Sequence, residues 1–224
     1  ECQELCVKSW QGSPLADPEH AYLKRKGISG YLLHGYKDSL MVPMYQGDSM
    51  SGMQFIAPDG SKTFKTGSKL KGSMYLLTGK NKSVLCEGFA TAASIQQATG
   101  YIVYIAFNAG NLVEVAKQFN FDFIAADNDH HTEGNPGLTK AQEAAKLCGA
   151  KVVYPMGIKG TDFNDLHCER GIEAVRGYDM KYYESITIGF LIVFLVLASV
   201  AVARLTQIKD EAVRMREADE AIQI

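Results

Sequence analysis

The chain has 224 residues, of which 46% are apolar and 21% are charged. This composition excludes a wholly disordered protein, because enough apolar side chains are present to build a core. The formal net charge is only −2, but residues 1–86 carry 11 Lys and Arg against 7 Asp and Glu, whereas residues 87–183 carry 8 against 12. A basic region followed by an acidic one suits a protein that holds a polyanion and a divalent cation, and a solvated charge imbalance is the alternative.

The five cysteines are scattered along the chain and are odd in number. This pattern argues against a secreted disulfide scaffold and favours free thiols in a reducing cytosol.

Residues 1–82 are expected to form a small, basic, β-rich module. A short helix is predicted around residues 18–26, followed by strands at 39–45, 50–57 and 61–66. Gln46-Gly47-Asp48 and Pro58-Asp59-Gly60 supply the turns between these strands, so the pattern indicates a β-meander.

From residue 83 the pattern changes to short apolar strands that alternate with amphipathic helices. The predicted strands are 83–86, 101–107, 121–126 and 151–155, and the predicted helices are 91–99, 112–119, 138–148 and 164–175. Near-continuous apolar strands separated by helices predict an α/β domain over residues 83–178, with a parallel sheet flanked by helices on both faces. Ligands of such sheets bind at the carboxyl ends of the strands.

The C-terminal part predicts a membrane anchor. Residues 186–203 are 18 residues without a charge, and as a helix they would span about 27 Å, close to the hydrocarbon thickness of a bilayer. The alternative is a helix buried on every side. Residues 205–224 place apolar side chains at three- and four-residue spacings and predict an amphipathic tail. We therefore expect a cytoplasmic enzyme domain anchored to the inner membrane by this helix.

Carboxylates stand where the predicted strands end. Glu87 follows the first strand of the α/β domain, and Asp127 and Asp129 end the third. Residues i and i+2 of an extended segment point to one side, so the two aspartates can present both carboxylates to one cation. Mg²⁺ prefers such oxygen ligands and keeps waters that substrate phosphates displace, and Mn²⁺ is the alternative cation.

Asp162 and Asp165 lie on the loop after the fourth strand. Two interpretations stay open for them: they support the metal, or they cap the following helix.

Basic side chains cluster in the first module. Residues 60–86 contain six lysines and no acid, and a second cluster lies at residues 24–26. The candidates for binding nucleic acid or nucleotide are Lys24, Arg25, Lys26, Lys62, Lys65, Lys69 and Lys71. The alternative is an edge strand whose lysines prevent aggregation.

Four segments carry a family resemblance: CEGFATAASIQQATG, AFNAGNL, AADNDHHTEGNPGLTKAQEAA and KGTDFNDLH. In this order they resemble the TOPRIM domain of plasmid and phage DNA primases, and the preceding residues are similar to the segment before it in those primases. The resemblance covers roughly residues 17–176. It implies a metal-dependent phosphotransfer site in which Glu87 is the general acid or base and Asp127 and Asp129 hold magnesium.

The expected function is therefore magnesium-dependent primer synthesis on a single-stranded DNA template from nucleoside triphosphates. The 224 residues contain no P-loop motif of the helicase type, so a separate helicase is an expected partner. Two alternatives stay open: a TOPRIM nuclease, and a catalytically silent, membrane-tethered module that binds nucleic acid.

Overall fold

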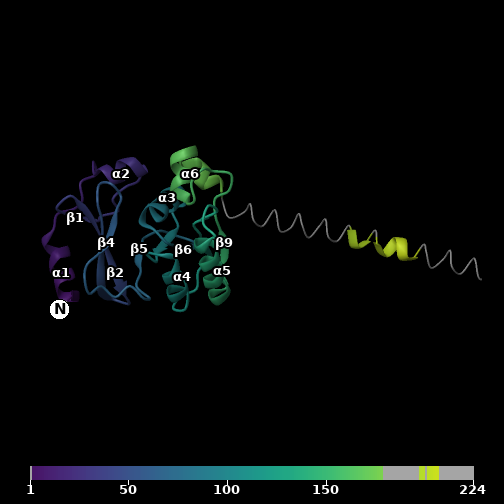
Figure 1. The fold of residues 1–224 in the computed structure, drawn as a ribbon, viewed down its shortest axis with the longest axis horizontal. Coiled ribbons are helices and arrows are strands. Elements are labelled where there is room, and N and C mark those ends of the chain that lie inside the picture. Colours follow the sequence, from purple (N-terminus) through teal and green to yellow (C-terminus); the bar gives the residue numbers. More distant parts are fainter. Residues whose placement is uncertain (1, 179–196, 200, 207–224) are drawn as a thin grey trace, which may run out of the picture. The chain divides into compact units, whose positions relative to one another are not determined.

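The computed structural model describes residues 2–178, 197–199 and 201–206. Residues up to Tyr178 form one compact unit that contains two β-sheets, and a second unit starts at residue 179 (Figure 1). All five cysteines are free, as predicted.

The first sheet is an antiparallel meander. Its strands follow the chain in the order β1 (His34–Tyr36), β2 (Ser39–Gln46), β3 (Ser49–Ile56) and β4 (Lys62–Phe64). The turn between β2 and β3 contains Gly47 with a φ of 55°, a conformation that glycine adopts without steric cost. The predicted meander is confirmed, with β1 as an additional strand.

Two helices accompany this sheet. Helix α1 (Cys2–Gly12) lies against it and buries Cys6 between Met41, Met50 and Met53. Helix α1 was not predicted, because only Cys6 of its 11 residues is buried and the apolar periodicity is correspondingly weak. Helix α2 (Ala21–Lys26) was predicted, and it ends at Gly27 in the left-handed conformation.

The second sheet has the strand order β5-β7-β6-β8-β9. The four predicted strands, β6 (Ser83–Cys86), β7 (Ile102–Ile105), β8 (Phe123–Ala125) and β9 (Lys151–Val153), are parallel.

The prediction of a wholly parallel sheet is wrong at one edge. Strand β5 (Tyr75–Leu77) pairs antiparallel to β7, so the sheet is mixed. The chain enters this edge directly from the β4 side and needs no crossover helix. Gly79 then passes so close to the backbone of Tyr101 that a Cβ would lie 2.1 Å from the carbonyl oxygen of that residue.

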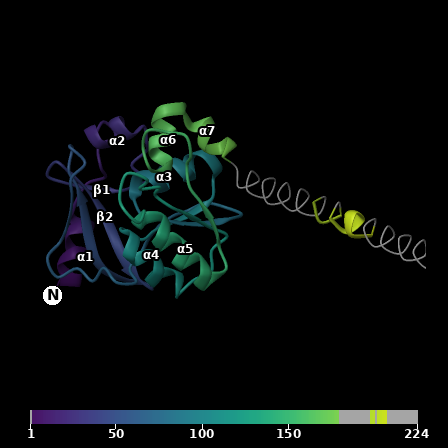
Figure 2. The same cartoon turned by 45° about the vertical axis from the view of Figure 1, so that its right-hand side comes forward.

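Helices cover both faces of the second sheet (Figure 2). On one face α3 (Phe89–Thr99), α6 (Phe163–Arg170) and α7 (Ile172–Gly177) contact one another, and on the other face α4 (Ala109–Ala116) contacts α5 (Pro136–Cys148). The single helix predicted at 164–175 is in fact two helices, because Gly171 takes a φ of 85° and breaks it.

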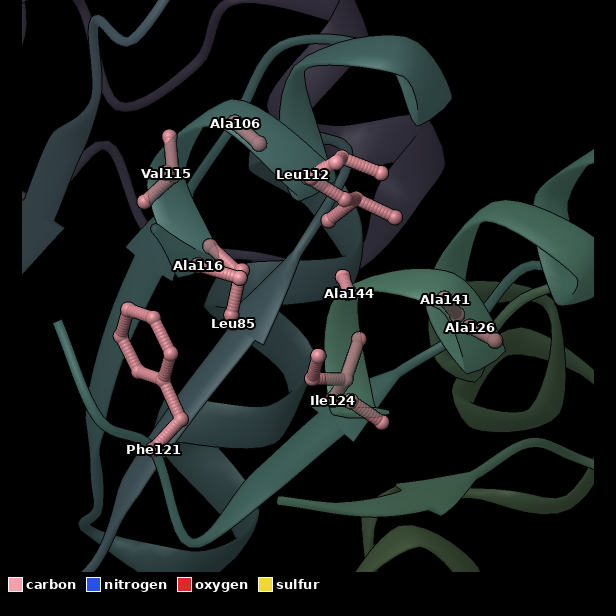
Figure 3. Close-up of a cluster of buried hydrophobic side chains, with 12 residues drawn as sticks. Leu85, Ala106, Leu112, Val115, Ala116, Phe121, Ile124, Ala126, Ala141 and Ala144 are labelled. Atoms are coloured by element: carbon pink, nitrogen blue, oxygen red, sulfur yellow. The ribbon is translucent and has the colours of Figure 1, made fainter. Parts of the chain in front are cut away.

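Small side chains let α4 and α5 approach the sheet closely. Figure 3 shows this core, in which Leu85 and Ile124 from the central strands meet Leu112 of α4 and two alanines of α5, Ala141 and Ala144. All five side chains are fully buried. The close packing holds the carboxyl ends of β6 and β8 rigidly in place.

The predicted membrane helix and tail fall mostly outside the described residues. Of residues 186–203 and 205–224 the structure describes only 197–199 and 201–206, so both stay predictions. Within the part of the chain that is described, no helix has the length and apolar character needed to cross a bilayer.

Candidate active site

A cleft of about 360 Å³ lies at the carboxyl ends of the parallel strands. The loop after each of these strands contributes one side chain to it: Glu87 after β6, Phe107 after β7, Asp127 after β8 and Asp162 after β9. The first module supplies the opposite side through α2 and the chain from Asp59 to Lys62. The cleft therefore joins the acidic and the basic regions of the sequence.

Glu87 and Asp127 are neighbours because their strands are paired. Cys86 of β6 is in register with Ala125 of β8, so the residues that follow leave the sheet side by side. One carboxylate oxygen of each, Oε1 of Glu87 and Oδ1 of Asp127, is buried without a hydrogen-bond partner. Buried unpaired carboxylate oxygens are rare and mark a place where a cation or proton is expected.

Burial and mutual repulsion raise the pKa values of these two carboxyls into the neutral range. Burial is the main cause that raises the pKa of Glu87 to about 7, and the negative charge of Asp129 adds to it. Burial likewise raises the pKa of Asp127 to about 8, followed by the charges of Glu87 and Asp162. A divalent cation would relieve this repulsion.

The loop after β8 is shaped by Asn135. Its side-chain oxygen accepts the N–H of Asp129 at 2.9 Å, and its amide donates to Asn128 at 2.8 Å. The carboxylate of Asp129 accepts the N–H of Gly137 at 3.1 Å, at the start of α5. Asp129 does not line the cleft itself, but its charge acts on Glu87 and Asp127.

Asp162, at the N-cap of α6, and Asp165, in its first turn, have different environments. Asp162 lines the cleft and also caps α6, since its side chain accepts the N–H of Asp165 at 2.8 Å. Burial raises the pKa of Asp162 and the charge of Asp165 adds to it, whereas the hydrogen bond from the backbone N–H of Asp165 opposes this rise. Asp165 accepts the N–H of Thr161 at 2.9 Å and lies 3.6 Å from the ammonium of Lys26. The capping interpretation is therefore correct for Asp162, which faces the cleft as well.

The structure divides the basic candidates into two groups. Arg25, Lys26 and Lys62 line the cleft, and the positive charge of Lys62 lowers the pKa of both Glu87 and Asp127.

The other four lie elsewhere. Lys24 pairs with Glu19, and Lys71 lies 3.6 Å from Glu114. Lys69 lines a separate hollow beside α1, and the positive charge of Lys65 opposes the rise that burial causes in the pKa of Cys6. None of these four is among the residues that line the cleft.

The donor set fits a hard divalent cation. No three His, Cys, Asp or Glu side chains among the described residues are close enough to form a complete protein shell. Mg²⁺ does not need one, because it binds through one or two carboxylates and leaves positions for waters and phosphates. The unpartnered oxygens of Glu87 and Asp127 meet this requirement.

Seven residues of the cleft were not predicted from the sequence: Tyr22, Asp59, Gly60, Gly88, Ala90, Thr91 and Phe107. Phe107 was assigned to the end of the predicted strand at 101–107, although the strand ends at Ile105. The acidic candidates were selected because they follow predicted strands. With the strand ending at Ile105, the same criterion would have selected Phe107. No pattern in the sequence singles out Tyr22 or Thr91.

Comparison with known proteins finds a family that matches the α/β domain. Residues 82–173 match the Toprim domain family. Two proteins from Escherichia coli named DNA primase TraC are similar to the chain, one with 35% identity over 167 residues and one with 34% over 163 residues. The matches cover 66% and 64% of this chain but only 16% and 11% of those proteins, so the chain spans a small part of their length.

Solved structures of similar fold are also primase domains. The DnaG catalytic core superposes with a TM-score of 0.57 and 12% identity, covering 80% of this chain and 79% of that one. The primase fragment of the bacteriophage T7 primase-helicase protein gives a TM-score of 0.54 with 16% identity, covering 75% and 79%. At such identities these two likenesses concern the fold.

Proposed function

On the premise that the chain contains a TOPRIM domain of the plasmid-primase type, we propose that it synthesises short primers on single-stranded DNA with magnesium as cofactor. One observation carries the proposal. Glu87 and Asp127, each with one buried carboxylate oxygen that has no hydrogen-bond partner, line a single cleft together with Arg25, Lys26 and Lys62. A nucleoside triphosphate with its cation is complementary to both sides of such a cleft.

The two sides of the cleft have different tasks in this proposal. Glu87 and Asp127 would hold Mg²⁺ (or Mn²⁺), with Asp129 and Asp162 as nearby negative charges. When bound, the cation polarises the phosphates and offsets negative charge that develops on them. Arg25, Lys26 and Lys62 would bind the phosphate oxygens and orient the nucleotide for attack.

Glu87 is the residue best suited to move a proton. Without metal, burial raises its pKa to about 7, and a bound cation would favour the ionised form that can accept a proton. In primer synthesis the ionised form would accept the proton of the attacking 3′-hydroxyl. That oxygen then forms a bond with the α-phosphorus, and pyrophosphate leaves.

Asp165 and Lys26 are assigned a positioning role. Their ion pair joins α2 of the first module to the first turn of α6. The contact would keep Arg25 and Lys26 at a set distance from the acidic loops. Template selection and an associated helicase would be supplied outside the described cleft, since the relatives are several times longer.

The test is an incubation of the chain with single-stranded DNA, labelled nucleoside triphosphates and Mg²⁺. New short products that require template and metal are expected from the unaltered chain. Glu87→Gln and Asp127→Asn should abolish them, whereas the exposed, ion-paired Glu143 offers a matched control as Glu143→Gln.

Two other outcomes would reject primer synthesis. Shortened template without new products would indicate the nuclease alternative. Binding of DNA without any reaction in Mg²⁺ or Mn²⁺ would indicate a silent binding module.

A further inference from the structure

Two phenylalanines meet at the edge of the cleft. Phe107 lines the cleft and is 8% exposed, whereas Phe64, on strand β4, is 40% exposed. Their ring centroids lie 6.3 Å apart with an interplanar angle of 74°, an edge-to-face contact. Phe64 belongs to the first sheet and Phe107 follows β7 of the second sheet, so the contact joins the two sides of the cleft.

The backbone of Phe107 is held in an unusual conformation. Its φ is 72°, which is uncommon for any residue except glycine and an outlier for a bulky one. Hydrogen bonds fix the chain on both sides of it: the Asn111 side chain donates to the carbonyl of Ala106, and the Asn108 side chain accepts the N–H of Asn111. Conformations of this kind gather at sites that bind ligands, because the surroundings must enforce them.

Phe64 is placed beside a phosphate-binding candidate. Lys62 and Phe64 are two residues apart on one strand, so their side chains leave the same face. Lys62 lines the cleft, and β4 is an exposed edge strand. A cation for phosphates and an exposed aromatic ring therefore stand next to each other, which matches the two chemical parts of a nucleotide.

We propose that Phe64 and Phe107 form an aromatic wall that binds a nucleobase. Phe64 offers the accessible ring, and Phe107 supports it from inside the cleft. The inference rests on the proposed function only in that Lys62 and its neighbours bind phosphate. The base belongs to an incoming nucleoside triphosphate or to the single-stranded template, and both present the same flat π-surface.

The test measures binding by calorimetry with the full chain, and primer synthesis separately. The probes are Mg-ATP, Mg-tripolyphosphate, an oligothymidylate and an abasic oligonucleotide of equal length. The variants are Phe64→Ala, Phe64→Trp and the control Phe119→Ala. Phe119 is 37% exposed and packs with Tyr104 and Phe121 away from the cleft.

Loss of one base–ring stack should weaken binding by about 5- to 150-fold. Phe64→Ala is expected to do so for Mg-ATP, if the nucleotide supplies the base, or for oligothymidylate, if the template does. Binding of Mg-tripolyphosphate and of the abasic strand should not change. Phe64→Trp should retain binding, and Phe119→Ala should leave all four affinities unaltered.

Three results would overturn the proposal: equal affinities for Phe64→Ala and the unaltered chain, equal losses for probes with and without bases, or no binding of either base-containing probe by the unaltered chain. If Phe64→Ala selectively loses base binding but the unaltered chain makes no primers, primer synthesis is rejected and the aromatic wall is supported.

Discussion

Asp127→Asn should stabilise the metal-free protein, and the gain should grow with pH. The substitution keeps the size of the side chain but removes its charge. In the folded chain, burial and neighbouring carboxylates raise the pKa of Asp127 from its ordinary value of 3.8 to about 8. The folded state therefore binds a proton that the unfolded state releases over most of this range.

The sign follows from proton linkage. Below pH 3.8 the folded and the unfolded state both carry the proton on residue 127, so the raised pKa does not lower the free energy of unfolding. Between pH 3.8 and about 8 the unfolded state is favoured increasingly, and folding stability falls as the pH rises.

The size of the effect follows from the same shift. One pKa unit corresponds to about 1.4 kcal/mol, so the full shift sets an upper limit of about 6 kcal/mol. Glu87 titrates in the same range and shares the repulsion, so relaxation and coupling leave roughly 2 to 4 kcal/mol for Asp127→Asn at pH 8. For a domain of this size this is a rise in Tm of roughly 4 to 16 °C, with a smaller rise at pH 5.

Thermal unfolding in EDTA at pH 5, 6, 7 and 8 measures this effect. Glu143→Gln is the control, because Glu143 is exposed and paired with Lys140. Added Mg²⁺ should raise the Tm of the unaltered chain and have less effect on Asp127→Asn. A gain of the same size at pH 5 and pH 8, or a loss at pH 8, would refute the reasoning.

Three more predictions concern the surroundings of the carboxylates. Lys62→Gln should raise the pKa of Glu87 further, because it removes the charge that opposes the shift, and the pH profile of Mg²⁺ binding should move to higher pH. Asn164→Ala should lower the free energy of unfolding by about 1 to 3 kcal/mol, measured in urea, because this fully buried amide donates two hydrogen bonds at 2.8 and 3.0 Å that join three segments of the chain. Gly137→Ala should weaken Mg²⁺ binding, since the new Cβ would lie 2.5 Å from the carbonyl oxygen of Asp127 in the loop after β8. Gly110→Ala is the control, because the nearest atom to its new Cβ would lie 3.5 Å away. Equal Mg²⁺ affinity in both variants would contradict the expectation.

Part of this protein is determined by local sequence patterns. The alternation of apolar strands and amphipathic helices after residue 83 specifies four parallel strands, because periodicity reports which side of each element is buried. The same pattern locates Glu87 and Asp127, since residues that follow adjacent parallel strands must leave the sheet together. Metal and catalytic roles for them are supported by this geometry and stay proposals.

Other features depend on contacts between distant segments. The apolar pattern of helix α1 is too weak to predict the helix from its own residues, and its buried Cys6 packs against methionines of the first sheet. Strand β5 joins the second sheet at its edge, although its residues precede the alternating pattern.

The cleft shows why the lysines could not be ranked from sequence. Lys62 and Lys71 belong to the same basic stretch, yet Lys62 faces Glu87 and Lys71 pairs with Glu114 of α4. Periodicity describes burial within one element and says nothing about the neighbour that an exposed side chain meets. That neighbour is decided by the register and rotation with which the two sheets pack, and only the tertiary structure sets these.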